Sequence, residues 1–191
     1  MKQELIKLFD LKIIYLIKSS SWVTNLVPVR KKSGEIRLCV YFRNLNQASL
    51  KDNYALPPME QILHKVARAC YFLMIDGYLG FIQIWVKDED QFKTTFTTKW
   101  GTFTFQKMPF GIFNAGATFQ RAMDHAFGEL INKIILIYLD DIIFFSKSIN
   151  DHLEHLRQVF EKCMKFGISI NLKKLIFMVN QGKLLDHIIL K

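Results

Sequence analysis

Two adjacent carboxylates, Asp140 and Asp141, lie between two apolar segments that cover residues 134–139 and 142–145. Each segment has the length and the β-branched or aromatic content of a strand, so this stretch predicts a hairpin whose turn contains both acids. Buried carboxylates need partners, and a divalent cation such as magnesium is a suitable one for a carboxylate pair. Because Asp is also common in solvated β-turns, this stretch by itself leaves both interpretations open.

A third acid, Asp76, ends an expected strand over residues 71–76. The order of expected strands and helices after residue 70 predicts an α+β fold, an antiparallel sheet with helices packed on one face. If the strand that ends at Asp76 is a neighbour of the hairpin, three carboxylates meet at adjacent strand ends. Such a cluster could hold two metal ions.

The composition predicts a globular protein with a polyanionic partner. Half of the 191 residues are hydrophobic, 17 are Phe, and the net charge is +9. A strongly basic chain favours nucleic acid, although a basic soluble protein without such a partner has the same composition. The three widely spaced cysteines, Cys39, Cys70 and Cys163, fit reduced thiols. With no apolar segment of signal-peptide or membrane-span type, we expect an intracellular protein, in a cytoplasmic particle or the nucleus, without membrane contact.

The remaining elements follow from periodicity and turn residues. We expect helices over residues 2–10, after Pro57-Pro58, and after Asn114 and Ser148, which would cap their helices. We expect one hairpin from residues 23–29 and 36–42, a second hairpin from residues 92–98 and 101–108, and further β structure over residues 81–86 and 168–172. The helix after Ser148 is expected to end at Gly167. It is expected to bury Leu153, Leu156, Val159, Phe160, Cys163 and Met164. Five basic residues within fourteen positions suit phosphate contacts, namely Arg30, Lys31, Lys32, Arg37 and Arg43.

Several motifs, in the right order, resemble the reverse transcriptases of Gypsy-type LTR retrotransposons. Residues 138–141, Tyr-Leu-Asp-Asp, resemble the family's Y-x-D-D box. Residues 107–120 resemble its M-P-F-G…N-A-P-A-T-F-Q run, and residues 29–46 resemble its fingers motif, V-x-K-K…R-x-C-V-D-Y-R-x-L-N. Residues 51–57 and 152–160 also fit, so the resemblance covers nearly the whole chain.

This resemblance implies an RNA-directed DNA polymerase with a right-hand polymerase palm and part of the fingers. Residues 1–70 would form part of the fingers, and residues 71–191 the palm with an interleaved fingers segment, ending in the primer-grip strand. The partners would be an RNA or DNA template with its primer and a deoxynucleoside triphosphate. Asp76, Asp140 and Asp141 would bind two magnesium ions, with manganese as an alternative, for transfer of the nucleotide to the primer 3′-hydroxyl.

The resemblance also implies roles for other side chains. Lys174 would act in catalysis by protonating pyrophosphate, although it also fits a solvated cation. Phe81 would lie under the sugar and exclude a 2′-hydroxyl, whereas without the family pattern it would be ordinary strand core. The other residues implied at the nucleotide are Lys31 and Arg37 at the triphosphate, and Phe110, Gly111, Gln120 and Tyr138 around the pocket.

Departures from the family pattern leave three hypotheses. The acid of V-D-Y-R is Tyr41, the His of the strand-end motif is Ile82, the Pro of N-A-P is Gly116, and the Gly of the primer grip is Asp186. An active polymerase module is the first hypothesis. An inactive retroelement remnant is the second, because we expect no thumb in this chain. A nucleic-acid-binding module without chemistry is the third, and the three intact acids argue against it.

Overall fold

The computed structural model describes the chain except for residues 31–33, 35, 77–79, 140, 171–180, 185, 186 and 191. For residues 36, 37, 75, 76, 181–184 and 187–190 it describes the backbone alone. The chain forms two compact units, Met1–Asp52 with Phe81–Gly116, and Asn53–Gly80 with Ala117–Lys191. We predicted a boundary between fingers and palm at residues 70 and 71, and this boundary remains a prediction. The first division between the compact units falls after Asp52.

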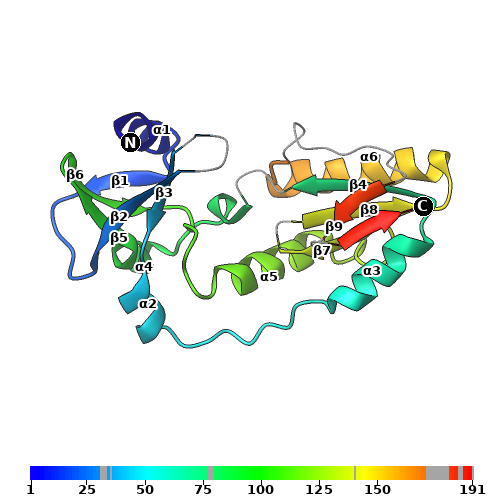
Figure 1. Cartoon of the computed structure of the whole chain (residues 1–191), viewed down its shortest axis with the longest axis horizontal. Coiled ribbons are helices and arrows are strands. Elements are labelled where there is room, and N and C mark those ends of the chain that lie inside the picture. Colours follow the sequence, from blue (N-terminus) through cyan, green and yellow to red (C-terminus); the bar gives the residue numbers. More distant parts are fainter. Residues whose placement is uncertain are drawn as a thin grey trace. The chain divides into compact units, whose positions relative to one another are not determined.

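The first unit is built on a five-stranded sheet in the order β1-β6-β5-β2-β3 (Figure 1). Its strands are β1 (Ile14–Ile17), β2 (Val23–Arg30), β3 (Ile36–Val40), β5 (Thr95–Thr98) and β6 (Gly101–Phe105). Its helices are α1 (Lys2–Asp10), α2 (Arg43–Ala48), α4 (Asp88–Gln91) and the 3₁₀ turn η2 (Phe92–Thr94). The predicted hairpins β2–β3 and β5–β6 are confirmed as antiparallel pairs. Between them, β2 and β5 pair in parallel, which joins two segments that are distant in the sequence.

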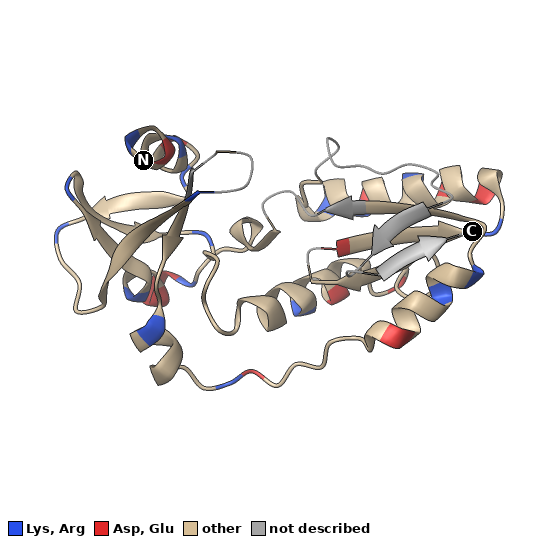
Figure 2. Ribbon diagram, viewed as in Figure 1, with Lys and Arg blue, Asp and Glu red and all other residues tan. Residues whose placement is uncertain are grey.

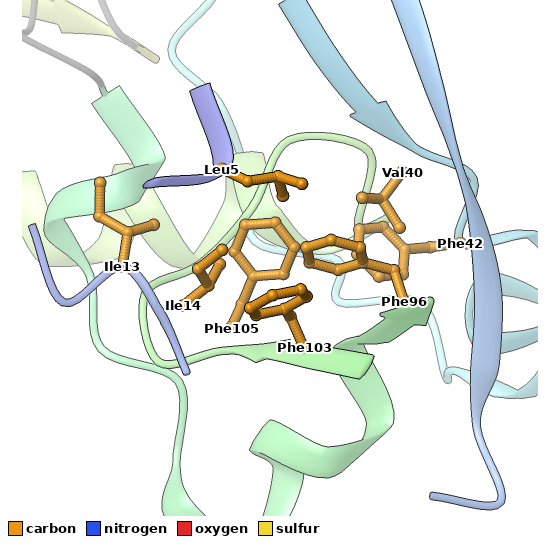
Figure 3. Close-up of a cluster of buried hydrophobic side chains, with 8 residues drawn as sticks. All are labelled: Leu5, Ile13, Ile14, Val40, Phe42, Phe96, Phe103 and Phe105. Atoms are coloured by element: carbon orange, nitrogen blue, oxygen red, sulfur yellow. The ribbon is translucent and has the colours of Figure 1, made fainter. Parts of the chain in front are cut away.

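Aromatic side chains form the core of this first unit (Figure 3). The ring centroid of Phe96 lies 5.8 Å from that of Phe103 and 5.3 Å from that of Phe105. Phe42 makes an edge contact with Phe105 at 6.3 Å, and Leu5 of α1 closes the cluster. Such ring pairs stabilise the fold by about 0.5–1.5 kcal/mol beyond the contribution of the apolar area that they bury. The core therefore joins β3, β5 and β6 to the N-terminal helix.

The second unit has a three-stranded antiparallel sheet in the order β4-β8-β7. Its strands are β4 (Tyr71–Asp76), β7 (Ile135–Tyr138) and β8 (Asp141–Ser146), and a separate hairpin pairs β9 (Gln181–Leu184) with β10 (His187–Leu190). Its helices are α3 (Met59–Arg68), α5 (Ala115–Phe127) and α6 (Ile149–Phe166). This sheet with its helices confirms the predicted α+β class.

Both faces of this sheet carry helices. Ile62 and Val66 of α3 pack with Phe72, Leu136 and Ile143 on one face. On the other face, the hydroxyl of Ser146 at the end of β8 is hydrogen-bonded to Nδ1 of His152 in α6. The sequence predicted helices on one face of the sheet alone. Helix α6 agrees with this prediction, but α3 covers part of the opposite face.

Helix α6 begins and ends where the sequence predicted. The Ser148 hydroxyl accepts a hydrogen bond from the backbone N–H of Asp151, and Gly167 ends the helix with φ +65°. The predicted buried stripe was too wide, however, because Leu153, Phe160 and Met164 are exposed. The buried positions are His152, Leu156, Val159 and Cys163, which form one narrow face.

The predicted strand over residues 81–86 is wrong. Residues Gly80–Gln83 form a 3₁₀ turn, η1, and the backbone N–H of Ile84 donates to the carbonyl of Phe81. This i to i+3 bond turns the chain where a strand would extend. Only an isolated bridge between Trp85 and Lys107 remains of the expected ladder. The expected strand at 92–98 likewise begins only at Thr95, after η2.

Lys and Arg residues occur in both units and are not confined to one element (Figure 2). Within the described part of the chain, no helix combines the length and apolarity needed to span a bilayer.

Candidate active site

One group of predicted site residues lies at a pair of strand ends in the second unit. In the antiparallel ladder of β4 and β8, Asp76 is the direct partner of Asp141. Tyr138 of β7 also pairs with Asp141, so three predicted site residues meet in one rung of the sheet. The prediction that the turn contains both acids is therefore wrong for Asp141, which is the first residue of β8. Direct cross-strand partners have Cβ atoms about 4.5–5.5 Å apart. The predicted adjacency of the two acidic strand ends is therefore confirmed at the level of the backbone.

Asp140 and the side chain of Asp76 lie outside the described residues. Among the side chains that are described, no three His, Cys, Asp or Glu residues form a metal-binding cluster. The donors available at this rung are nevertheless carboxylate oxygens, the hard ligands that magnesium and manganese prefer. Their chemistry fits the predicted metals.

Gln120 of α5 forms hydrogen bonds with the backbone at the end of β7 and at the residue that follows it. Its Oε1 accepts a hydrogen bond from the backbone N–H of Leu139 at 2.9 Å. Its Nε2 donates to the Ile137 carbonyl at 3.2 Å and to Oδ1 of Asp124 at 3.0 Å. Leu139 has φ +54°, a left-handed conformation that costs a non-glycine residue about 1–2 kcal/mol. Gln120 thus stabilises a strained residue that directly precedes Asp140.

This network continues to the segment that precedes α3. The Tyr54 hydroxyl donates to Oδ2 of Asp124 at 2.7 Å, and this hydrogen bond raises the pKa of Tyr54 above its ordinary value. The Arg121 guanidinium lies 4.7 Å from the centroid of the Tyr54 ring. Tyr54, Asp124 and Gln120 therefore form a chain of hydrogen bonds that reaches Leu139, the residue before Asp140. Sequence reasoning missed Tyr54 and Asp124, because nothing local connects positions seventy residues apart.

Gln120 was predicted to contact the nucleotide. Its side chain is only 1% exposed, and its described contacts are all with the protein. These contacts give Gln120 a positioning role at the turn, and the contact with a nucleotide remains a prediction.

In the first unit, two predicted pocket residues contact each other. The rings of Phe81 and Phe110 pack edge to face, with centroids 5.2 Å apart. Next to Phe110, Gly111 has φ +97°, and a Cβ atom at Gly111 would lie 3.3 Å from the Val40 carbonyl oxygen. This close approach explains the glycine of the M-P-F-G run.

The loop that contains Gly111 is fixed by asparagines. Asn46 of α2 donates through Nδ2 to the Gly111 carbonyl at 2.8 Å and accepts from the Phe113 backbone N–H at 2.8 Å. Asn114, predicted to cap α5, uses its side chain to contact the segment after α2. It accepts from the Asp52 backbone N–H at 3.0 Å and donates to the Leu50 carbonyl at 2.7 Å. In the sequence, the one signal for Asn46 was its place as the last residue of the fingers motif.

The remaining predicted site residues are Lys31, Arg37 and Lys174. Lys31 and Lys174 lie outside the described residues, and for Arg37 only the backbone in β3 is described.

Comparison with known proteins assigns the family. Residues 29–189 match the family model described as "Reverse transcriptase (RNA-dependent DNA polymerase)". The chain is 39% identical over 171 residues to the Pol polyprotein from transposon 297 of Drosophila melanogaster, covering 90% of the chain and 16% of that polyprotein. It is 34% identical over 155 residues to the corresponding gypsy polyprotein, covering 81% of the chain and 15% of the relative.

A shorter relative and a solved structure give further matches. An "RNA-directed DNA polymerase homolog" of Oenothera berteroana is 34% identical over 129 residues, which cover 66% of the chain and 91% of that protein. The foamy viral protease-reverse transcriptase in complex with double-stranded DNA has the same fold, with a TM-score of 0.90 at 24% identity, covering 99% of the chain and 33% of that structure. The same enzyme was also solved with an RNA/DNA hybrid, with a TM-score of 0.89 at 23% identity, covering 99% and 25% respectively.

The chain spans only about a sixth of the transposon polyproteins that it matches. Within that span, the family model covers most of its residues and the motif order agrees. The chain belongs to the reverse transcriptase family, and its relatives include retrotransposon polyproteins of the gypsy kind.

Proposed function

We propose that this chain carries the nucleotidyl-transfer site of an RNA-directed DNA polymerase. The observation that supports this most directly is the pairing of Asp76 with Asp141 across β4 and β8. Nucleotide addition develops negative charge on the attacking and leaving oxygens, so the site must supply cations. Two acidic residues in one rung, with a third that directly precedes Asp141 in the sequence, are suited to hold them.

Asp76, Asp140 and Asp141 would hold two magnesium ions. When bound, these ions would activate the primer 3′-hydroxyl and stabilise the leaving pyrophosphate. The protein's own contribution is to hold the carboxylates in place. The Gln120 hydrogen bonds to Ile137 and Leu139 support that placement, because they fix the backbone immediately before Asp140.

Other predicted residues would contact the nucleotide. Lys31 and Arg37 would contact the triphosphate, and Lys174 would donate a proton to pyrophosphate. Phe81 would support the sugar, with Phe110 and Gly111 beside it. The edge contact between Phe81 and Phe110 supports this assignment, because it fixes the Phe81 ring against a second aromatic surface.

The template would be RNA or DNA paired with a primer. The net charge of +9 suits a polyanion, and the fold neighbours include a reverse transcriptase bound to double-stranded DNA and to an RNA/DNA hybrid. These complexes describe those proteins, and their binding mode is extended to this chain as part of the proposal.

An inactive remnant with the same fold is the second candidate. It is favoured by Tyr41 and Ile82, which replace the acid and the His of the family motifs. Such a protein would bind nucleic acid and metal without extending a primer.

Primer extension separates these candidates. The purified chain is given an RNA template, a labelled DNA primer, deoxynucleotides and magnesium, beside the variants Asp140→Asn and Asp141→Asn. We expect extension by the unmodified chain and loss of it in both variants. Asp10→Asn, which removes an exposed carboxylate at the end of α1, is the matched control and should extend normally.

Absence of extension by the unmodified chain would favour the remnant, and equal extension by the Asp140 and Asp141 variants would exclude these acids from catalysis. The Phe81 assignment has its own test. Phe81→Val should increase the incorporation of ribonucleotides relative to deoxynucleotides, and unchanged discrimination would refute the sugar contact.

A further inference from the structure

Asp124 of α5 is a half-buried acid whose two carboxylate oxygens contact different parts of the second unit. It follows Gln120 by four residues, a spacing that sets both side chains on one face of the helix. Its Oδ1 accepts a hydrogen bond from Nε2 of Gln120 at 3.0 Å, and its Oδ2 accepts from the Tyr54 hydroxyl at 2.7 Å. A single carboxylate therefore connects the segment before α3 to the Gln120 amide.

This carboxylate favours one orientation of the Gln120 amide. An ionised carboxylate only accepts hydrogen bonds, so it can pair with the NH₂ end of an amide but not with the oxygen end. Because Nε2 donates to Asp124 and to the Ile137 carbonyl, Oε1 is directed at the backbone N–H of Leu139. A reversed amide would set its oxygen against two acceptors and its NH₂ group against a donor. Gln120 is buried, so water has little access to replace a lost partner.

Tyr54 and Arg121 hold the carboxylate of Asp124 in place. Both hydrogen bonds to Asp124 have an ionised acceptor, which makes them stronger than bonds between neutral groups. The Arg121 guanidinium carbon lies 4.7 Å from the centroid of the Tyr54 ring, so the ring contacts α5 at a second point. Asp124 is thus fixed through both of its oxygens, unlike an acid on an open helix surface.

The backbone that Gln120 contacts is continuous with the acidic strand ends. Ile137 pairs with Ile142 in the ladder of β7 and β8, and the next rung pairs Tyr138 with Asp141. Leu139 then directly precedes Asp140 in the sequence. A shift of the Gln120 amide would therefore change the backbone on which the acids are carried.

We propose that Asp124 is a positioning residue for nucleotidyl transfer. It acts through Gln120 on the backbone that carries Asp140 and Asp141, and Tyr54 keeps its carboxylate oriented. Residues that orient metal ligands from outside the metal site typically change metal affinity by about 10–100-fold when they are replaced. The catalytic consequence rests on the proposed function, whereas the ordering of the backbone is a property of the folded chain alone. The two parts therefore have separate tests.

Amide hydrogen exchange tests the ordering of the backbone without metal or substrate. The isotope-labelled full chain is followed by NMR in EDTA. Asp124→Ala should raise the exchange rate of the Leu139 amide about tenfold, as expected when a hydrogen bond loses its support, with little change in the amides of β8. Asp124→Asn keeps an acceptor for the Gln120 amide and should retain most of the protection. Tyr54→Phe should give a smaller rise, and it serves as the test if Asp124→Ala does not fold.

A double substitution shows whether the effect passes through Gln120. In a chain that already carries Gln120→Met, Asp124→Ala should cause no further rise in Leu139 exchange. Glu129→Gln is the matched control, because it removes an exposed carboxylate of the same unit whose ion pair is with Lys162. It should leave Leu139 unchanged. No rise in Asp124→Ala, an equal rise throughout β8, or a full rise in the Gln120→Met background would overturn the proposal.

The catalytic part is tested by the metal requirement of primer extension. Asp124→Ala should raise the Mg²⁺ concentration that gives half of the maximal rate several-fold, with Asp124→Asn close to the unmodified chain. A smaller folded fraction would lower the maximal rate without moving this concentration, so general destabilisation gives a different result. If the unmodified chain extends no primer, the proposed function fails. Mn²⁺ binding followed by electron paramagnetic resonance then makes the same comparison without catalysis. An unchanged metal requirement and unchanged Mn²⁺ affinity in Asp124→Ala would refute the positioning role.

Discussion

Gln120 accepts a 2.9 Å hydrogen bond from the backbone N–H of Leu139, a residue held at φ +54°. A leucine in this conformation is strained, and the surrounding structure must compensate for it. The compensation comes from a buried amide that also contacts the Ile137 carbonyl. The backbone geometry of Ile137 and Leu139, just before Asp140, is thus set partly by α5, a helix that precedes them in the chain.

Replacement of Gln120 should therefore destabilise both the fold and the site. Gln120→Met keeps most of the volume but removes the partners of two backbone groups, and we expect a loss of about 1–3 kcal/mol in the free energy of unfolding. Urea denaturation measures this loss, and primer extension should fall at the same time. Gln61→Met on the exposed face of α3 should change stability by less than about 0.5 kcal/mol. A similar effect of both substitutions would contradict the role given to Gln120.

Stability at alkaline pH should depend on Tyr54. Its hydrogen bond to Asp124 raises the pKa of Tyr54 in the folded state, so the unfolded chain releases this proton first. The stabilising contribution is complete below the ordinary tyrosine pKa of about 10 and is lost as the pH rises through the folded-state value. Tyr54→Phe should show a weaker decline of stability above pH 10 in denaturation experiments. A decline identical to that of the unmodified chain would exclude this linkage.

Gly111 and Gly34 form a matched pair for backbone strain. Both have positive φ, +97° and +86° respectively. Gly111→Ala and Gly34→Ala should share the cost of a left-handed alanine, about 1–2 kcal/mol. Only at Gly111 would the new Cβ atom approach a described backbone atom, the Val40 carbonyl oxygen at 3.3 Å. Thermal unfolding should rank Gly111→Ala as the less stable variant, and the reverse order would contradict the described loop.

The thiols should differ in reactivity. Burial raises the pKa of Cys163 to about 11, so this thiol is almost entirely protonated at pH 8, whereas Cys70 is exposed. Because the thiolate is the nucleophile, iodoacetamide should modify Cys70 well before Cys163 in the native protein. Mass spectrometry of timed samples would show the order, and addition of urea should remove the difference. Rapid native labelling of Cys163 would contradict its burial.

The sequence determined the local elements and the family. The apolar runs around Asp140 and Asp141 predicted the β7–β8 hairpin, and Ser148 and Gly167 predicted both ends of α6. These features depend on side-chain alternation, capping groups and backbone preferences within a few residues, so they can be read from a short window. The order of the family motifs could also be recognised in the sequence alone, and the family assignment agrees with it.

The tertiary structure decided which distant residues meet. The register that sets Asp76 opposite Asp141, the parallel pairing of β2 with β5, and the contacts of Gln120 with Leu139 all join segments far apart in the sequence. The local pattern also gave a wrong prediction at residues 81–86. The apolar side chains there suggested a strand, but the backbone of Gly80–Gln83 forms a 3₁₀ turn. Strand order and buried polar partners depend on which alternative packing satisfies every backbone group and buries the most apolar surface. That choice is made by the whole chain at once, and no single segment of this sequence contains it.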